Sequence, residues 1–139
     1  MEERVVAVSG GFDPLHVGHL RMIQTAKALG TRLVVIVNRD EFLKQKKGYV
    51  FMPLEERMEI LRGLRDVDEV VAAVDSDQTV RETLRLVKPH VFANGGDRSD
   101  EAVIPEAGVC RELGIEMVFN VGGGKIQSSS DLVRGSGWT

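Results

Sequence analysis

Two histidines near the start of the chain have the spacing of a phosphate-binding site. His16 and His19 follow an apolar run that ends in Gly10 and Gly11, and Gly18 lies between the two histidines. His19 should begin a helix, where exposed backbone N–H groups and the positive end of the helix dipole attract anions. Two fixed imidazoles can donate hydrogen bonds to charge that develops on phosphorus, without a covalent intermediate. The pattern predicts a site for phosphate chemistry.

The same residue types also occur in sites of a different kind. A His-x-x-His pair can be a metal site or a pair of capping side chains, and glycines often only end a strand. The place of the pair after the first apolar run and beside Asp13 favours close approach of a nucleotide to Gly10 and Gly11. Asp13 would hold Mg²⁺ through water. The dinucleotide-binding Gly-x-Gly-x-x-Gly run and the P-loop are absent here, so hydride transfer and P-loop ATPase chemistry lose support.

Three further polar groups follow later strands of the predicted fold. Lys44, Lys46 and Lys47 lie in the polar stretch 39–52, which we expect to be a flexible loop that closes over a triphosphate; the alternative is a solvated surface. Asp97 and Arg98, just after Gly95, would bind ribose or base and phosphate, or form a polar turn. Ser128, Ser129 and Ser130 would bind the β and γ phosphates beside Lys125, although one serine could serve as a helix cap.

Composition restricts the class of protein. A chain of 139 residues with 42% hydrophobic content fits one domain, 1–139. The formal net charge of −3 argues against a nucleic-acid partner, and no apolar run approaches a membrane span. The single cysteine, Cys110, suits a reducing cytoplasm and helix packing. We expect a soluble cytoplasmic protein without a signal peptide or membrane partner.

The elements that must position these residues alternate between strands and helices. Short valine-rich runs and amphipathic segments predict a doubly wound, Rossmann-like α/β domain with a five-stranded parallel sheet, whose ligands bind beyond the carboxyl ends of the strands. The expected strands are 4–9, 32–38, 90–94 and 116–121, and the segment 66–72 should form a turn followed by a further strand. The expected helices are 19–29, 53–64, 79–87 and 104–113, with a short last helix after Ser128 or Ser129.

The run from Gly10 to His19 resembles the Gly-x-Phe-Asp-x-x-His-x-Gly-His signature, with its HxGH core, of the nucleotidylyltransferase superfamily. The segment 126–130 is similar to the second signature, Ile-Ser-Ser/Thr-Thr/Ser. The resemblance covers nearly the whole chain and is closest to glycerol-3-phosphate cytidylyltransferases. The segment 92–97 is more similar to adenylyltransferases that activate heptose phosphates.

The resemblance implies an Mg²⁺-dependent attack of an acceptor phosphate on the α phosphorus of a nucleoside triphosphate, with loss of pyrophosphate. His16 and His19 would stabilise the transition state, and Lys44 and Lys46 would contact the phosphates. The expected nucleotide-binding residues are Gly10, Gly11, Phe12, Asp13, Gly18, Gly95, Asp97, Arg98, Lys125, Ser128, Ser129 and Ser130. A homodimer through the region 66–71 is also implied.

Two departures from the cytidylyltransferases concern substrate choice. Gly122-Gly123-Gly124-Lys125 replaces their Arg-Thr-Glu-Gly run, so Lys125 or Arg134 would supply the arginine's contact to the nucleotide. Gly95-Gly96-Asp97-Arg98 replaces the Gly-Asp-Asp-Trp of the glycerol-phosphate enzymes. We expect transfer of CMP from CTP to a small phosphate or phosphonate acceptor. Transfer of AMP from ATP to a sugar phosphate is the alternative, and a nucleotide-binding regulatory module without turnover is a third hypothesis.

Overall fold

A computed structural model describes residues 2–77, 79–95 and 104–121 of the chain. Five strands in these residues form one sheet in which every pair of neighbours is parallel. The predicted α/β fold with a five-stranded parallel sheet is confirmed. The strands are β1 (Val5–Gly10), β2 (Arg32–Val37), β3 (Glu69–Ala72), β4 (Val91–Gly95) and β5 (Glu116–Val121).

The order of the strands places β1 at the centre of the sheet. The order is β3-β2-β1-β4-β5, so the chain builds outward in one direction from β1 and then returns to its other side with β4. Strand β1 pairs with β2 along its whole length, from Val5 opposite Arg32 to Gly10 opposite Val37. The switch point of this doubly wound sheet lies between the carboxyl ends of β1 and β4, where ligands of such folds bind.

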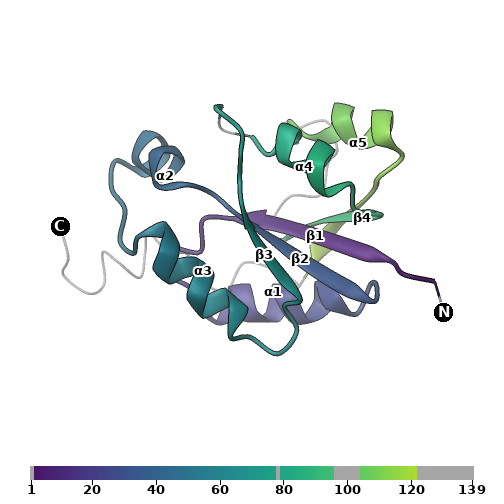
Figure 1. The fold of residues 1–139 in the computed structure, drawn as a ribbon, viewed down its shortest axis with the longest axis horizontal. Helices are drawn as coiled ribbons and strands as arrows, with labels where there is room; N and C mark the ends of the chain where they lie inside the picture. Colours follow the sequence, from purple (N-terminus) through teal and green to yellow (C-terminus); the bar gives the residue numbers. More distant parts are fainter. Residues whose placement is uncertain (1, 78, 96–103, 122–139) are drawn as a thin grey trace.

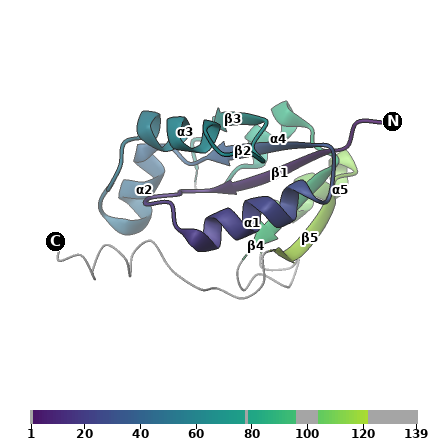
Figure 2. The same ribbon diagram turned by 90° about the horizontal axis from the view of Figure 1, so that it is seen from below.

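Helices cover both faces of the sheet (Figure 1). Helices α1 (Val17–Lys27) and α3 (Leu54–Arg62) lie together on one face, and α4 (Arg81–Val87) and α5 (Ala107–Leu113) lie on the other (Figures 1 and 2). Ile23 and Leu61 pack with Val6 and Val8 in the first core. The second core contains Cys110, which is buried as the composition predicts. Because β1 is covered on both faces, its residues 6–8 are fully buried.

One segment differs from the sequence prediction in kind. A helix, α2 (Asp40–Lys47), replaces most of the flexible loop expected over 39–52, so that prediction is wrong for these residues. Acidic residues occupy the first turn and lysines the last, which suits the helix dipole. Gly48 ends the helix in the left-handed conformation (φ 86°), and Leu43 anchors it by burial. The lysines therefore lie on a helix beyond the carboxyl end of the sheet (Figure 1).

The remaining predicted elements are present with shifted ends. Helix α1 starts at Val17, two residues before the expected start, while α4 starts at Arg81 and α5 at Ala107, later than expected. The third strand, Glu69–Ala72, occupies the second part of the predicted turn and strand, and Gly95 belongs to β4 rather than lying beyond its end. The expected last helix falls outside the described residues. Within those residues, no helix is long and apolar enough to cross a membrane.

Candidate active site

The histidine pair forms the N-terminus of α1, at the carboxyl end of the central strand. His16 is the N-cap residue, and its Nδ1 accepts a hydrogen bond from the backbone N–H of Gly18 at 3.1 Å. His19 reaches back, and its Nδ1 accepts from the backbone N–H of His16 at 3.2 Å. The rings stack with centroids 3.8 Å apart. The two histidines therefore form a reciprocal capping box, in which each side chain satisfies a backbone donor of the first turn.

The capping bonds fix which ring nitrogen carries the proton. Because Nδ1 of each ring accepts a hydrogen bond, the proton of each neutral imidazole lies on Nε2. Burial, the neighbouring His16 and the charge of Lys47 together lower the pKa of His19 to about 3. His19 is thus a neutral imidazole at physiological pH. The pair offers two N–H donors beside the exposed amides of a helix N-terminus, as an anion site requires.

The side chain of Phe12 packs against the histidine pair from the side of the core. Its side chain is buried in the first core, and its ring meets the ring of His19 edge-on with centroids 4.9 Å apart. Its backbone takes the left-handed conformation (φ 53°), which is rare for a residue with a large side chain. A Cβ on Gly10 would lie 3.2 Å from the Phe12 ring, so Phe12 occupies the space that this glycine leaves open. Phe12 therefore orients His19 from within the core.

Arg57 joins the segments around the site. Its side chain is fully buried, and its guanidinium donates to the carbonyl oxygens of Met52 (2.9 Å), Gly11 (2.8 Å) and Asn38 (2.7 Å). A fourth bond, at 2.6 Å, goes to Oδ1 of Asp40 at the start of α2. A single planar cation with its donors in fixed directions can tie four segments together. Arg57 thus links the turn before the histidines, the end of β2, the start of α2 and the segment before α3.

Asp13 forms a second link, and it does not fit a magnesium ligand. The residue is 1% exposed, and its carboxylate oxygens accept the backbone N–H groups of Phe51 (2.7 Å) and Met52 (2.5 Å). A Mg²⁺ ion bound through water needs a carboxylate that reaches solvent. The carboxylate of Asp13 instead holds the segment 48–53 against the histidine turn. Among the described residues, no group of three His, Cys, Asp or Glu side chains is placed to hold a metal ion.

The lysines of α2 differ in their surroundings. Lys47 is half-buried, and its Nζ donates to the backbone carbonyl oxygen of Asp13 at 3.1 Å. Lys44 and Lys46 are exposed, and the ammonium of Lys46 lies 5.7 Å from the centre of the Phe42 ring. Lys47 is thus bonded to the segment that leads into the histidines. The predicted phosphate contacts of Lys44 and Lys46 stay predictions.

Close packing inside the protein explains several glycines. A Cβ on Gly18 would lie 2.9 Å from Cε1 of His16, and one on Gly11 would lie 2.9 Å from a methyl group of Leu43. A Cβ on Gly95 would lie 2.7 Å from the sulfur of Met22 on α1. These glycines let the histidine ring, α2 and α1 pack closely. Their predicted contacts with a nucleotide stay predictions.

Six of the sixteen predicted site residues lie outside the residues that the structure describes. This group comprises Asp97, Arg98, Lys125, Ser128, Ser129 and Ser130. The structure does bring together the described candidates Gly10, Gly11, Phe12, Asp13, Gly18, His16 and His19, with Gly95 at the end of neighbouring β4. These eight candidates thus lie at the switch point that the fold predicts.

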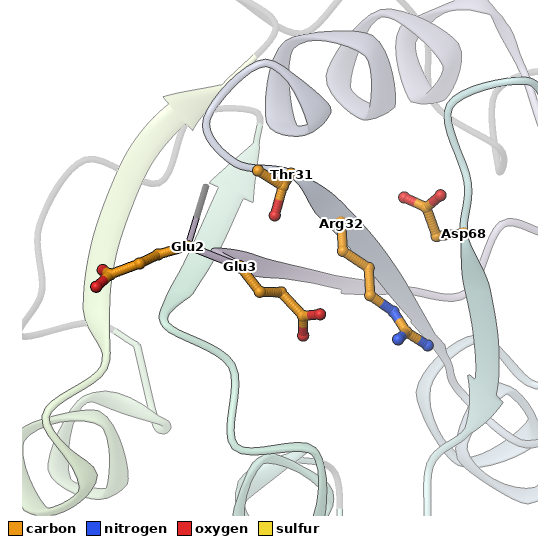
Figure 3. Close-up of a pocket in the computed structure, with 5 residues that line it drawn as sticks. All are labelled: Glu2, Glu3, Thr31, Arg32 and Asp68. Carbon is orange, nitrogen blue, oxygen red and sulfur yellow. The ribbon is translucent and has the colours of Figure 1, made fainter.

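An open depression lies at the opposite edge of the sheet, where the strands begin (Figure 3). Its lining residues are Glu2, Glu3, Thr31, Arg32 and Asp68. Two of these side chains are paired: Arg32 with Glu69, and Asp68 with Lys27 at 2.5 Å. The hydrogen bond from Lys27, the bond from the Leu33 amide and the nearby charges of Lys27 and Arg32 lower the pKa of Asp68. This depression has mixed charge and lies at the edge away from the histidines, so it is not the candidate site.

The sequence prediction missed Arg57, and it placed Lys47 on the segment expected to close over a triphosphate without naming it among the site residues. One signal for Arg57 was present: Leu54, Arg57, Met58 and Leu61 have the spacing of one helix face, so a charged residue falls on an apolar stripe. A charge on such a stripe indicates a buried, paired group. No comparable signal separates Lys47 from its neighbours, because only the phase of α2 decides which lysine faces the histidine turn.

Similarity to known proteins agrees with this geometry. A family model described as "Cytidylyltransferase-like" matches residues 7–116. The chain is 40% identical over 123 residues to the bifunctional protein HldE of Methylococcus capsulatus, covering 87% of this chain and 24% of that protein. It is 44% identical over 94 residues to FAD synthase of Pyrococcus abyssi, covering 67% of this chain and 63% of that protein. The chain therefore spans about a quarter of the HldE protein and under two thirds of the FAD synthase.

A solved structure is similar over most of the fold. The lipopolysaccharide core biosynthesis protein of Thermoplasma volcanium superposes with a TM-score of 0.73 at 28% identity, covering 86% of this chain and 95% of that one. The overall architecture is therefore shared across most of both chains.

Proposed function

Because this chain belongs to the cytidylyltransferase-like family of nucleotidyltransferases, we propose that it transfers a nucleoside monophosphate to a small phosphorylated acceptor. An oxygen of the acceptor phosphate attacks the α phosphorus of a nucleoside triphosphate. The new P–O bond forms as the bond from the α phosphorus to the bridging oxygen breaks, and the electron pair leaves with pyrophosphate. No covalent enzyme intermediate is needed, so catalysis consists of positioning and electrostatic stabilisation.

One observation carries the proposal: the stacked imidazoles of His16 and His19, each with Nδ1 held by a backbone amide. This arrangement leaves the Nε2–H groups as donors of fixed direction at the N-terminus of α1. Donors that are already oriented stabilise charge on the transferred phosphate without reorganising during the reaction. His16 and His19 would bind the α-phosphate oxygens in this way.

We propose ATP as the nucleotide. CTP was the nucleotide expected from the sequence, but the relatives support the adenylyl alternative better. The Pyrococcus relative is an FAD synthase, and FAD contains an AMP unit. The similarity of residues 92–97 to adenylyltransferases that activate heptose phosphates favours the same nucleotide. A sugar phosphate is the corresponding acceptor class, and it is consistent with the Thermoplasma neighbour being a lipopolysaccharide core biosynthesis protein.

The remaining parts of the site are proposals as well. Asp97, Arg98 and Lys125 would bind the nucleotide, Ser128, Ser129 and Ser130 would bind the β and γ phosphates, and Mg²⁺ would arrive on the triphosphate, since Asp13 does not fit it. A homodimer and a cytoplasmic location stay predictions.

The test measures pyrophosphate release from ATP and from CTP with a panel of sugar, alditol and phosphonate monoesters. We expect turnover with ATP and a sugar phosphate. Faster turnover with CTP would restore the cytidylyl hypothesis. If no triphosphate releases pyrophosphate, the proposal that the protein is an enzyme is refuted.

A variant of His16 distinguishes an enzyme from a nucleotide-binding module. In His16→Asn the amide oxygen can still cap α1, because asparagine is a good N-cap residue, but the Nε2–H donor is lost. An enzyme should lose about 100-fold or more in kcat with nearly unchanged melting temperature and ATP affinity. A change in affinity alone would indicate a binding module without turnover.

A further inference from the structure

We propose that Phe51 is a specificity-determining residue, whose ring packs against the C–H face of a cyclic sugar phosphate acceptor. The inference rests on the proposed function and narrows its acceptor class, because it favours ring-closed sugar phosphates over open-chain monoesters such as alditol phosphates. In this scheme His16 and His19 bind the transferred phosphate, and Phe51 contacts the part of the acceptor that does not react.

Phe51 differs from the other aromatic residues in its exposure. Of the phenylalanine and tyrosine side chains in the part of the chain that the structure describes, only that of Phe51 is exposed, and the residue has 37% of its surface in contact with solvent. A ligand that covers this ring removes apolar surface from water, and this transfer favours binding. Phe51 therefore offers binding free energy that no other described aromatic residue offers.

The backbone of Phe51 is fixed beside the turn that precedes His16. Its N–H donates to Oδ2 of Asp13 at 2.7 Å, and the N–H of Met52 donates to Oδ1 of the same carboxylate at 2.5 Å. Asp13 is buried and lies three residues before His16. The ring of Phe51 is thus carried by a backbone that is already ordered before substrate binds, which lowers the entropy cost of using it as a contact.

A second exposed apolar residue adjoins the same turn. Val17, which follows His16 and begins α1, is 42% exposed. Small-molecule sites combine apolar lining with a few polar groups that fix orientation. The histidine pair supplies the polar groups here, and Phe51 and Val17 supply apolar surface. A ligand of phosphate and hydroxyl groups alone would leave that surface in water, so the geometry favours an acceptor with an apolar face.

The position of Phe51 in the fold indicates contact with the acceptor rather than with the nucleotide. Phe51 lies in the connection from α2 to α3, between β2 and β3 in the chain, whereas Gly95 ends β4 on the other side of β1 (Figure 1). The serines proposed for the β and γ phosphates follow β5 in the sequence. Because the attacking and leaving oxygens of a phosphate transfer lie roughly in line, the acceptor approaches from the side opposite the pyrophosphate. That assigns the acceptor to the β2 side, with Phe51.

The chemistry of an aromatic face selects a ring-closed sugar. The face of a phenyl ring is partly negative, and the C–H groups on one face of a pyranose are partly positive. The pyranose presents these groups in a fixed, nearly flat arrangement. An open-chain alditol must lose torsional freedom to present the same surface, so it gains less from the contact.

The experiment measures steady-state pyrophosphate release with ATP and two matched pairs of acceptors. The cyclic probes are glucose 1-phosphate and mannose 1-phosphate, and the open-chain probes are glucitol 1-phosphate and mannitol 1-phosphate. In Phe51→Ser we expect KM for the cyclic probes to rise about tenfold, while kcat, KM for ATP and KM for the open-chain probes stay within about threefold of wild type.

Two further variants separate the ring from the fold. Phe51→Tyr keeps an aromatic ring and should keep the wild-type KM for the cyclic probes. Leu86→Ser is the matched control, because it removes an apolar side chain that is 69% exposed on α4, on the opposite face of the sheet from α3. It should leave every KM unchanged. Phe51→Ser should fold, because the bond to Asp13 comes from the backbone and serine retains it.

Binding measurements keep this inference distinct from the proposed function. Calorimetry in the presence of α,β-methylene-ATP, which cannot be cleaved at the α–β bond, gives the affinity for each probe without turnover. A selective loss of affinity for the cyclic probes in Phe51→Ser supports the contact even if the wild-type protein releases no pyrophosphate, the result that refutes the proposed function. Equal losses for cyclic and open-chain probes, a rise in KM for ATP alone, or no binding of the cyclic probes to wild type would overturn the role of Phe51.

Discussion

Nη2 of Arg57 lies 2.6 Å from Oδ1 of Asp40, which joins α3 to the first residue of α2 by a buried guanidinium. The side chain of Arg57 is 0% exposed, whereas that of Asp40 is 33% exposed. The pair is therefore asymmetric: the buried arginine depends on protein groups for its hydrogen bonds, whereas the aspartate retains contact with water. Through this pair and three backbone carbonyls, Arg57 holds α2, which carries the lysines, against the turn that precedes His16.

Replacement of Arg57 should unfold the region around the site. In Arg57→Met three part-buried carbonyls and Asp40 lose their donor, and we expect the free energy of unfolding to fall by about 3 kcal/mol or more. Asp40→Asn keeps a polar acceptor at a partly solvated position and should cost about 1 kcal/mol. Urea denaturation of both variants measures the difference. Equal losses in the two variants would contradict the asymmetry.

Asp13 should stabilise the fold rather than bind the metal. Asp13→Asn places an amide NH₂ where two backbone N–H groups now donate to a carboxylate, so we expect a loss of about 2 kcal/mol in unfolding free energy. The Mg²⁺ concentration that gives half-maximal activity should stay within about twofold of wild type, because the carboxylate of Asp13 already accepts two backbone N–H groups. A tenfold rise in that concentration would instead assign Asp13 to the metal.

Gly18→Ala should reduce activity without unfolding the protein. The new Cβ would lie 2.9 Å from Cε1 and 3.1 Å from Nδ1 of His16, so the imidazole must move. Alanine favours the first turn of α1 by up to about 1 kcal/mol relative to glycine, which offsets part of the strain. We expect kcat to fall at least about tenfold with a melting temperature near wild type. Gly108→Ala on α5 is the control, since its Cβ would meet nothing within 4 Å; a similar loss of activity there would refute the steric explanation.

The free energy of unfolding should decrease as the pH is lowered, because His19 is neutral in the folded protein. Its pKa is lowered from 6.5 to about 3. Below pH 6.5 the unfolded chain binds a proton that the folded protein does not bind, so the free energy of unfolding decreases as pH falls and the loss continues to about pH 3. The slope should be about 1 kcal/mol per pH unit between pH 6 and 4.

His19→Gln, which does not titrate in this range, isolates the contribution of that residue. Urea midpoints at pH 7, 6 and 5 should show a smaller decline for this variant than for wild type. Parallel declines would mean that different groups cause the acid sensitivity.

The sequence by itself determined the fold class and the place of the site. Valine-rich runs of strand length can be buried on both faces only in a sheet covered by helices, and alternation with amphipathic segments makes that sheet parallel. The pair His16 and His19 after the first strand then had to lie at the carboxyl edge. These are local patterns, so the order of residues was enough to predict them.

Only the tertiary structure decided how the site is held. Which lysine of α2 faces the histidines depends on the phase of a short polar helix, and the burial of Arg57 depends on carbonyls from segments up to 46 residues away, as in its bond to Gly11. The lowered pKa of His19 arises first from desolvation by burial, then from the neighbouring His16 and from the charge of Lys47 on another helix. Such effects act through space between residues distant in sequence, and the local pattern around each residue does not contain them.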